Sequence, residues 1–357
     1  MRQETRDRPR IADVAREAGV SKTAVSFAFN KPERLSPETA TRIRDIAVSL
    51  GYRPHPVARM LTQGRTRTLG ILTPQALSIV FANPFFATLC EGVAAVAEEA
   101  GYALLFVSPV HGSLARAVNR ATVDGFVAIG LAEDHPEVGQ IRRAGLPIVM
   151  VDSAAAFPEH AAVDVDDEGG ARLAAEHLLA LGHRDFLVIG VEPPTPGTQA
   201  SGGVVGRRLT GYREALAEAG IALRDDQVVA GPASVEGGIA CLTGAWEDGR
   251  RPTAILAMSD AMAIGAIHAA HRLGLRVPGD ISIVGFDDIE LSRHVEPPLT
   301  TVHQPVRRKG EEACRLLLSA IARDDLSRPD HRCLETRLIV RGSSGPARIE
   351  EEVAGGR

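Results

Sequence analysis

The chain has 357 residues, 45% of them hydrophobic and 24% charged, a composition that excludes fibrous, disordered and disulfide-scaffold proteins and predicts two or three globular domains. It contains no run of about 18 apolar residues, and the N-terminus lacks the apolar segment of a signal peptide, so we expect a cytoplasmic chain with no membrane partner. The formal net charge of −5 is unevenly distributed, because residues 1–68 carry 14 Lys and Arg against 7 Asp and Glu. A basic head therefore precedes an acidic body, and local positive charge of this kind favours nucleic acid as a partner.

Three short helices are expected in the head. The first presents one apolar face and ends at Gly19, a residue that tolerates left-handed backbone; the face comprises Ile11, Val14, Ala15 and Ala18. Ser21 is a good N-cap for the second, whose inward stripe is Val25, Ala28 and Phe29. The third follows Ser36 and Pro37 and ends at Gly51; its expected buried residues are Ile43, Ile46, Ala47 and Leu50.

The second helix has a small, polar and accessible outer face. Its members are Lys22, Thr23, Ser26, Phe27 and Asn30. Two helices joined by a tight turn, with a third packed beneath, form the helix-turn-helix arrangement whose second helix enters the major groove of DNA. Any three-helix domain would share the apolar stripes, so periodicity alone leaves both interpretations open.

Residues 54–64, PHPVARMLTQG, predict a short helix that is entered through prolines and closed by Gly64. A helix this short is unstable in water, so its folding would have to come from contacts with a partner. An ordinary linker is the alternative.

From residue 68 onward, apolar strands alternate with amphipathic helices. Strands are expected at 69–73, 103–107, 125–130, 147–152, 186–190, near 227, and at 254–258 and 281–286; helices are expected at 85–100, 113–121, 136–144, 167–181, 208–219, 235–246 and 260–273. This order predicts an α/β body of two doubly wound parallel-sheet lobes. Ligands of such folds bind beyond the carboxyl ends of the strands, here in the cleft between the lobes.

Specific strings sharpen this interpretation. IADVAREAGVSKTAVSFAFN begins at Ile11, and GYRPHPVARML begins at Gly51. The body contains NPFF, LGHRDF, RLTGYREAL, RPTAILAMSDAMAIGA, RVPGDISIVGFDDI and PPLTTVHQP. Together, from Ile11 to Ser344, they resemble the LacI/GalR (lactose-repressor) family of transcription regulators, whose body has the periplasmic-binding-protein-like fold.

The resemblance implies a division into a flexible arm at 1–9, a helix-turn-helix DNA-binding domain at 10–51, a hinge helix and linker at 52–66, an effector-binding and dimerisation domain at 67–345, and a tail at 346–357. It implies that Lys22 and Thr23 reach base edges. Phosphates would be held by Ser21, Ser26, Asn30 and Arg53. In the hinge, Leu61 would wedge between base steps in the minor groove and Ala58 would lie at the contact between paired hinge helices.

Four residues of the head and hinge depart from the family pattern. Arg10 stands where the family usually has a capping Thr, so that cap is lost or replaced. His55 and Pro56 are also unusual. Phe27 stands where many relatives carry a base-reading Arg; a phenylalanine cannot make the bidentate contact to guanine but can lie against a thymine methyl. We therefore expect a shift of operator preference toward A·T, the alternative being that Phe27 packs on the third helix.

The resemblance also assigns effector-binding residues. Phe85 and Phe86 would line the cleft, Asp152 would sit at the first crossover between lobes, Arg208 and Asp287 would bond a polar ligand, and Ser259 and Asp260 would lie near the rim. Carboxylate, guanidinium and aromatic ring together suit a carbohydrate. The alternatives are a core role for the two phenylalanines, a helix cap for Asp260 and a surface ion pair for Arg208.

Two departures bear on the effector. The sequence DSAAA at 152–156 lacks the Arg that commonly follows this Asp, and Ala233 replaces an aromatic residue of some relatives. Either the effector is atypical or the pocket is degenerate.

We expect neither catalysis nor a cofactor. The sequence has no Walker loop, no G-x-S-x-G elbow, no HExxH and no dinucleotide fingerprint. Cys90, Cys241, Cys314 and Cys333 have no paired spacing, so we expect buried free thiols and no metal. A free solute-binding protein would need an export signal and would have no use for a basic head.

The expected function is that of a homodimer or tetramer on a palindromic operator in double-stranded DNA. The default interpretation is a repressor released by a sugar-like effector. A regulator activated by a purine-like corepressor is the alternative.

Overall fold

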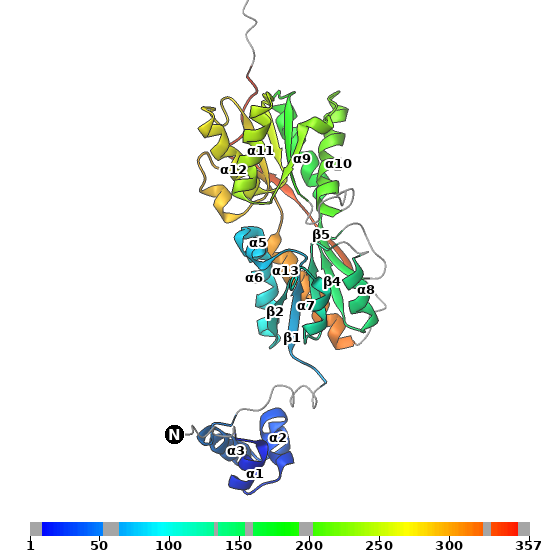
Figure 1. Ribbon diagram of the computed structural model, residues 1–357, viewed down its shortest axis with the longest axis vertical. Coiled ribbons are helices and arrows are strands. Elements are labelled where there is room, and N and C mark those ends of the chain that lie inside the picture. The colour runs from blue at the N-terminus through cyan, green and yellow to red at the C-terminus, as the bar shows by residue number, and fades with distance from the viewer. Residues whose placement is uncertain are drawn as a thin grey trace, which may run out of the picture. The chain divides into compact units, whose positions relative to one another are not determined.

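The computed structural model describes residues 9–52, 64–131, 135–153, 160–192, 203–323 and 330–348 (Figure 1). The chain divides into two compact units, Met1–Thr66 and Arg67–Arg357. Arg53, His55, Pro56, Ala58 and Leu61 lie outside the described residues.

The first unit contains α1 (Ile11–Glu17), α2 (Lys22–Asn30), the 3-10 helix η1 (Pro32–Arg34) and α3 (Pro37–Ser49). Gly19 and Gly51 follow α1 and α3 with φ of +66° and +70°, as the sequence predicts. The buried cluster of this unit is formed by Val14, Ala15, Ala18, Val25, Ala28, Ile43 and Ala47. Leu50 was expected in it but is 37% exposed, because it is the C-cap residue of α3 and turns away from the buried face.

Short polar side chains cap these helices. Ser21 Oγ accepts a hydrogen bond from the Ala24 amide at 3.1 Å, and Ser36 Oγ accepts one from the Thr39 amide at 3.2 Å. At α1, Asp13 Oδ2 accepts from the Arg10 amide at 2.9 Å. An acidic side chain inside the first turn thus satisfies an amide where the usual capping residue is missing.

The second unit begins with an N-terminal lobe built on a six-stranded sheet in the order β11-β5-β4-β3-β1-β2, with all neighbours parallel. The strands are β1 (Thr68–Leu72), β2 (Ala103–Val107), β3 (Phe126–Ile129), β4 (Ile148–Val151), β5 (Ala161–Val165) and β11 (His331–Leu334). Its helices are α5 (Leu77–Ala82), α6 (Pro84–Glu99), α7 (Leu114–Arg120), α8 (Pro136–Arg143) and α13 (Val306–Arg323).

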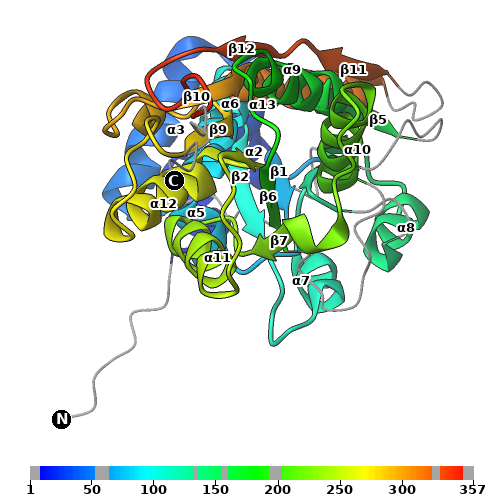
Figure 2. The same ribbon diagram turned by 90° about the horizontal axis from the view of Figure 1, so that it is seen from above.

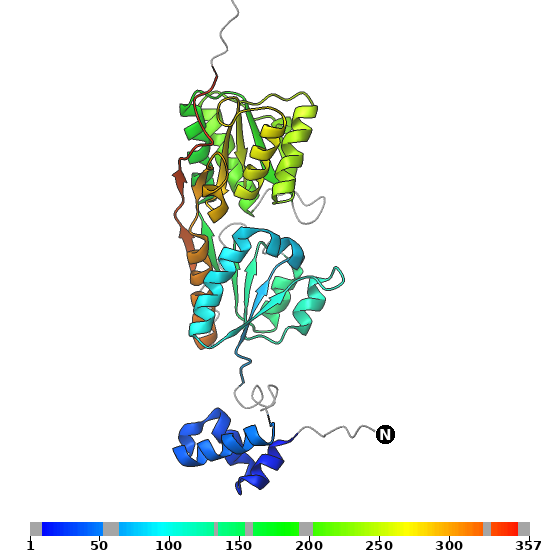
Figure 3. The ribbon, with the colours of Figure 1, turned by 90° about the vertical axis from the view of Figure 1, so that its left-hand side faces the viewer.

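Helices α6 and α13 pack side by side against this sheet (Figure 3). Two glycines allow the close approach. A Cβ atom on Gly92 would lie 2.0 Å from the Arg307 carbonyl oxygen, and one on Gly310 would lie 2.1 Å from the Leu89 carbonyl oxygen. No larger residue fits at either position without separating the helices.

The C-terminal lobe has a second six-stranded sheet in the order β12-β10-β9-β8-β6-β7. The strands are β6 (Phe186–Val191), β7 (Val228–Gly231), β8 (Ala254–Ala257), β9 (Ser282–Asp287), β10 (Thr300–His303) and β12 (Arg337–Ile339). Helices α9 (Asp167–Ala180) and α10 (Gly203–Glu218) pack together, as do α11 (Val235–Glu247) and α12 (Asp260–Arg272) (Figure 2). Short 3-10 helices, η2 (Asp225–Gln227) and η3 (Glu290–Arg293), complete the lobe. The predicted two-lobed fold is confirmed, with β12 as an antiparallel edge strand.

The chain crosses between the lobes three times: from β5 to α9, from β10 to α13 and from β11 to β12. Helix α13 and strand β11 follow most of the C-terminal lobe in sequence but belong to the N-terminal lobe. One expectation is corrected here. Asp152 does not sit at the first crossover, because the chain forms β5 in the same sheet before it crosses near residue 166.

No helix among the described residues is long and apolar enough to span a membrane. All four cysteines are free. Cys241 and Cys314 are buried, but Cys333 is exposed because it lies on the edge strand β11, so the expectation of buried thiols is wrong for that residue.

Candidate DNA-binding and ligand-binding sites

The outer face of α2 has the features of a groove-reading surface. Ser21, Lys22 and Thr23 are exposed, and Ser26, Phe27 and Asn30 are partly exposed. The structure thus leaves all six predicted residues accessible at the start and on the outer side of one helix, while Val25 and Ala28 are buried beneath them.

Contacts within this face already orient two of its side chains. Asn30 Nδ2 donates to Ser26 Oγ at 3.3 Å, and among the described residues Asn30 Oδ1 has no hydrogen-bond partner. The Arg34 guanidinium lies over the Phe27 ring, 5.4 Å from its centroid. Phe29, rather than Phe27, packs against the buried cluster that includes α3 residues. Sequence reasoning missed Arg34, although a basic residue in the turn after a recognition helix is a visible signal.

In the second unit, a chain of buried polar contacts runs through the crossovers. Lys309 Nζ donates to Asp152 Oδ1 and to Gln304 Oε1, each at 2.6 Å, although Lys309 is 0% exposed. Gln304 Nε2 donates to Asp287 Oδ1 at 2.6 Å. Asp152 and Asp287, at the carboxyl ends of β4 and β9, have φ of +57° and +129°, so both carboxylates are presented from strained backbone, as functional sites often require.

Lys309 and Gln304 were missed by sequence reasoning. A signal was available for Lys309, since it lies on the apolar face of α13 among Val306, Gly310, Ala313, Cys314 and Leu317. A lysine on the buried face of an amphipathic helix needs a carboxylate partner.

Arg208 continues the network on the C-terminal lobe. Its Nε donates to Asp167 Oδ1 at 2.9 Å, its Nη1 donates to the Met258 carbonyl at 2.5 Å, and its guanidinium lies 3.5 Å from the centroid of the Phe286 ring. Asp287 Oδ1 is 3.9 Å from Nη1. The surface ion pair considered for Arg208 is therefore wrong, because its side chain is 6% exposed.

The preceding residue, Arg207, was also missed. Its Nε and Nη2 donate to Asp167 Oδ2 at 3.1 and 2.7 Å, and its Nη1 donates to the Ser153 carbonyl at 2.6 Å. Two consecutive arginines thus share one carboxylate, each taking one oxygen, and the Asp167 side chain is completely buried between them.

The aromatic pair occupies the first turn of α6. Asn83 Oδ1 caps this helix by accepting from the Phe85 amide at 3.0 Å. The rings of Phe85 and Phe86 meet edge to face with centroids 5.5 Å apart, and the Lys309 ammonium lies 5.4 Å from the centroid of Phe85. Both rings are partly exposed and pack against the core of the N-terminal lobe. Phe85 therefore lies beside the polar network and contributes to the core as well.

Ser259 and Asp260 do not lie at an exposed rim. Ser259 caps α12 by accepting from the Met262 amide at 3.3 Å, and it is 6% exposed. Asp260 is 0% exposed; its Oδ1 accepts from Thr301 Oγ1 at 2.5 Å and its Oδ2 from the Ile289 amide at 2.9 Å. Both oxygens of Asp260 are therefore bonded inside the lobe, where they connect α12 to β10 and to the segment after β9. The expected ligand contact is corrected to a structural role.

Burial is the largest influence on the pKa values of three carboxyl groups in the second unit. It raises the pKa of Asp287, with Arg208 opposing the shift, and raises the pKa of Asp260 well above its ordinary value. It also raises the pKa of Asp164, beside Asp152. Within the described residues no cluster of His, Cys, Asp and Glu is arranged to hold a metal ion. Phe85, Asp152, Arg208 and Asp287 together provide hydrogen-bond donors, acceptors and an aromatic face, which is the chemistry of binding a polar molecule.

Comparisons with known proteins match both units of the chain. Residues 10–55 match the model of bacterial regulatory proteins of the lacI family, and residues 175–344 match the periplasmic binding protein-like domain. The HTH-type transcriptional regulator CelR of Thermobifida fusca is 33% identical over 347 residues, covering 95% of this chain and 99% of CelR. The repressor PurR of Yersinia enterocolitica is 35% identical over 353 residues, covering 95% and 98%.

Two solved structures match along the chain. A CelR–cellobiose complex has a TM-score of 0.71 at 30% identity and covers 94% of this chain and 100% of its own. The Lac repressor dimer bound to operator and the anti-inducer ONPF has a TM-score of 0.79 at 26% identity and covers 95% and 100%.

A helix-turn-helix head joined to a two-lobed, periplasmic-binding-protein-like body defines a DNA-binding transcriptional regulator with an effector domain. The chain belongs to the LacI family, a family of regulators rather than enzymes.

Proposed function

We propose that this regulator is a homodimeric repressor that binds a palindromic operator and is released by a carbohydrate effector bound between its lobes. The observation that carries the effector proposal is the buried network at the carboxyl ends of β4 and β9. It joins carboxylates and cations of both lobes beside an aromatic ring.

The proposed effector contacts are Asp152, Arg208 and Asp287 with the rings of Phe85 and Phe86. Carboxylates accept from hydroxyls and guanidinium donates to them, while a ring covers the apolar face of a sugar. The cellobiose complex of CelR supports a carbohydrate for this chain. The similarity to PurR keeps a purine-like corepressor as the second candidate, with the partly exposed Phe85 as a surface on which a base could stack.

On the operator, we propose that Lys22 and Thr23 read base edges and that Ser21, Ser26 and Asn30 hold phosphates. The exposure of Ser21, Lys22 and Thr23 and the partial exposure of Ser26 and Asn30 support these roles. From their place in the family motif, we further propose that Arg53 contacts a phosphate, that Leu61 wedges between base steps in the minor groove and that Ala58 lies at the contact between paired hinge helices. Phe27, held beneath Arg34, would favour a thymine methyl over guanine.

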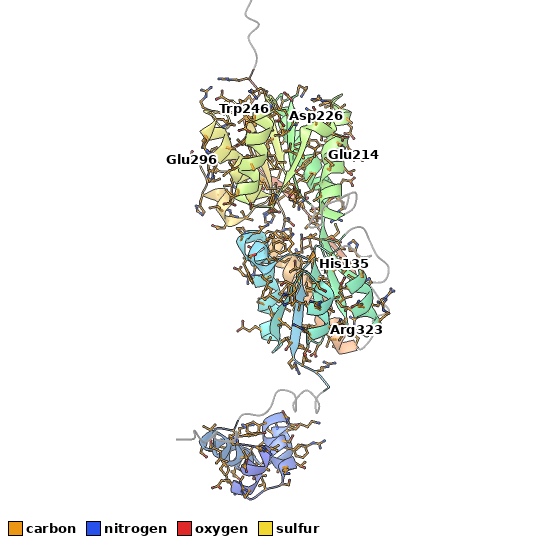
Figure 4. All side chains as sticks on the ribbon, in the orientation of Figure 1. His135, Glu214, Asp226, Trp246, Glu296 and Arg323 are labelled. Carbon is orange, nitrogen blue, oxygen red and sulfur yellow. The ribbon has the colours of Figure 1, made fainter. Side chains whose placement is uncertain are left out.

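The proposed dimer would use a groove on the C-terminal lobe. Its lining residues are Ile264, His268, His271, Leu291, His294, Val295 and Glu296. Leu291 is 48% exposed there, and Glu296 is labelled at the edge of the lobe in Figure 4. The groove combines apolar side chains with histidines and Glu296, so two copies related by a two-fold axis would bury Leu291 and bring the histidines of one copy close to Glu296 of the other.

Operator binding by the purified full-length chain, titrated with cellobiose, other sugars and purine bases, tests the proposal. Weaker operator binding with a sugar is the expected result. Tighter binding with a purine would establish the corepressor alternative, and failure to bind any operator from a random duplex library would overturn the proposal itself.

A further inference from the structure

We infer that Arg207 is a latch that holds the two lobes of the effector domain together through the protein's own atoms. The latch consists of Arg207, on α10 of the C-terminal lobe, with Asp167 at the crossover into α9 and Ser153 at the end of β4 in the N-terminal lobe. One guanidinium therefore contacts both lobes beside the crossover from β5 to α9.

The geometry is that of a strong contact. Nε and Nη2 form a fork on Asp167 Oδ2, and Nη1 reaches the Ser153 carbonyl at 2.6 Å. The Arg207 side chain is 24% exposed, but Asp167 is 0% exposed and Ser153 is 2% exposed, so both acceptors are shielded from water. Charge-assisted hydrogen bonds in such surroundings are stronger than bonds between neutral groups.

The negative charge around Arg207 keeps it in place. Asp164 Oδ1 lies 3.7 Å from Nη2, beyond hydrogen-bond range, and has no hydrogen-bond partner among the described residues. Asp164 Oδ2 is bonded to His331 on β11 at 3.0 Å. The guanidinium is thus surrounded by two carboxylates and one carbonyl. Arg208 contacts the other oxygen of Asp167, so it does not replace the bonds that Arg207 forms there.

A contact beside a crossover controls hinge motion. The three crossovers are the covalent links about which the lobes can rotate. Rotation that opens the cleft must break the bond from Arg207 to Ser153 while the Asp167 contact can persist, since α9 and α10 move together. An effector that separates Arg207 from Ser153 would release the latch, and one that leaves it intact would bind to the closed form.

Hydrogen–deuterium exchange of the full-length protein tests this without DNA or effector. Arg207→Leu removes the latch, and Arg207→Lys keeps a cation on Asp167 but cannot fork to both acceptors. In both variants we expect peptides lining the cleft on both lobes, around residues 150–153 and 304–309, to exchange about tenfold faster, which is the effect of losing one charge-assisted hydrogen bond. Arg213→Leu on the same helix removes an exposed pair with Asp225 and is the matched control, with no change in those peptides.

A merely structural Arg207 would give a different pattern. Faster exchange confined to α9 and α10, or unchanged exchange in every peptide of a folded Arg207→Lys protein, would overturn the latch. Neither result would affect the proposed DNA-binding function, because operator binding is measured separately on the same variants.

Discussion

Lys309 and Asp152 form a salt bridge of 2.6 Å in which the lysine is fully buried. Lys309 belongs to α13, which reaches the N-terminal lobe only after the chain has built most of the C-terminal lobe, whereas Asp152 ends β4. Two segments more than 150 residues apart thus share one buried charge pair.

Removing the lysine should destabilise the second unit. Lys309→Met leaves Asp152 and the Gln304 oxygen without their donor, and breaking one partner of a buried pair costs about 3–5 kcal/mol. Urea unfolding should show this loss. Arg315→Met, on the exposed side of α13, should lower the free energy of unfolding by less than about 1 kcal/mol. Equal losses for Arg315→Met and Lys309→Met would contradict a special role of the buried pair. The double variant Lys309→Met with Asp152→Asn should recover part of the stability.

Replacing Phe27 should change which operators are selected. Phe27→Arg restores a side chain that can form two hydrogen bonds with guanine, a preference of about 1–3 kcal/mol. Selection from a randomised operator pool should shift toward G·C at one position in each half-site. Phe27→Leu keeps an apolar contact and should retain the A·T preference; an identical consensus for Phe27→Arg and the unaltered chain would refute the assignment.

Two histidines make the second unit sensitive to acid. His183 bonds Thr253, Ser282 and the Gly345 carbonyl, and burial lowers its pKa below 6.5, as it does for His177, which bonds Ser344. Because the folded state resists protonation while the unfolded state does not, their contribution to stability is complete above the ordinary histidine pKa and is lost as the pH falls below about 6.5.

The pH dependence can be checked by substitution. His183→Gln should lower stability at neutral pH but show a smaller further loss between about pH 7 and pH 5. His111→Asn, at an exposed position outside the proposed dimer groove, should follow the unaltered protein. Buried carboxylates with raised pKa act in the opposite direction but equally in all three proteins, so the comparison of slopes isolates His183. Equal slopes would show that His183 does not carry the effect.

Charge placed in the proposed dimer groove should separate the subunits. Leu291→Glu introduces a carboxylate next to Glu290 and Glu296, and sedimentation should then show monomers with weakened operator binding. Leu173→Glu alters a side chain of similar exposure, 39% against 48%, on α9 of the same lobe. If Leu173→Glu dissociated the protein and Leu291→Glu did not, the dimer surface would have to be placed elsewhere.

Local signals made the head and the element order predictable. Gly19 and Gly51 end their helices with positive φ, and Ser21 and Ser36 cap the next ones, because these features depend on residues adjacent in sequence. The cleft was only partly predictable. Arg208, Asp152 and Asp287 were expected there, but their partners Asp167, Lys309 and Gln304 come from segments whose meeting is decided by the crossovers.

Asp260 shows why a motif position does not fix a role. Asp260 is the first residue of α12, a position suited to a helix cap or to a ligand contact. Its two carboxylate oxygens instead accept hydrogen bonds from the Thr301 hydroxyl and the Ile289 amide. Periodicity cannot reveal such long-range partners.

The return of α13 and β11 to the N-terminal lobe has a consequence for synthesis. The face of that lobe's sheet covered by α6 is completed by α13 residues such as Leu317 and Ile321, and its outer edge is β11. A nascent chain that ends before Val306 therefore carries an N-terminal lobe with an uncovered apolar face. Although this lobe is translated first, it cannot finish folding until almost the whole chain has been synthesised, and any premature stop within α13 or β11 leaves it open to chaperones and proteases.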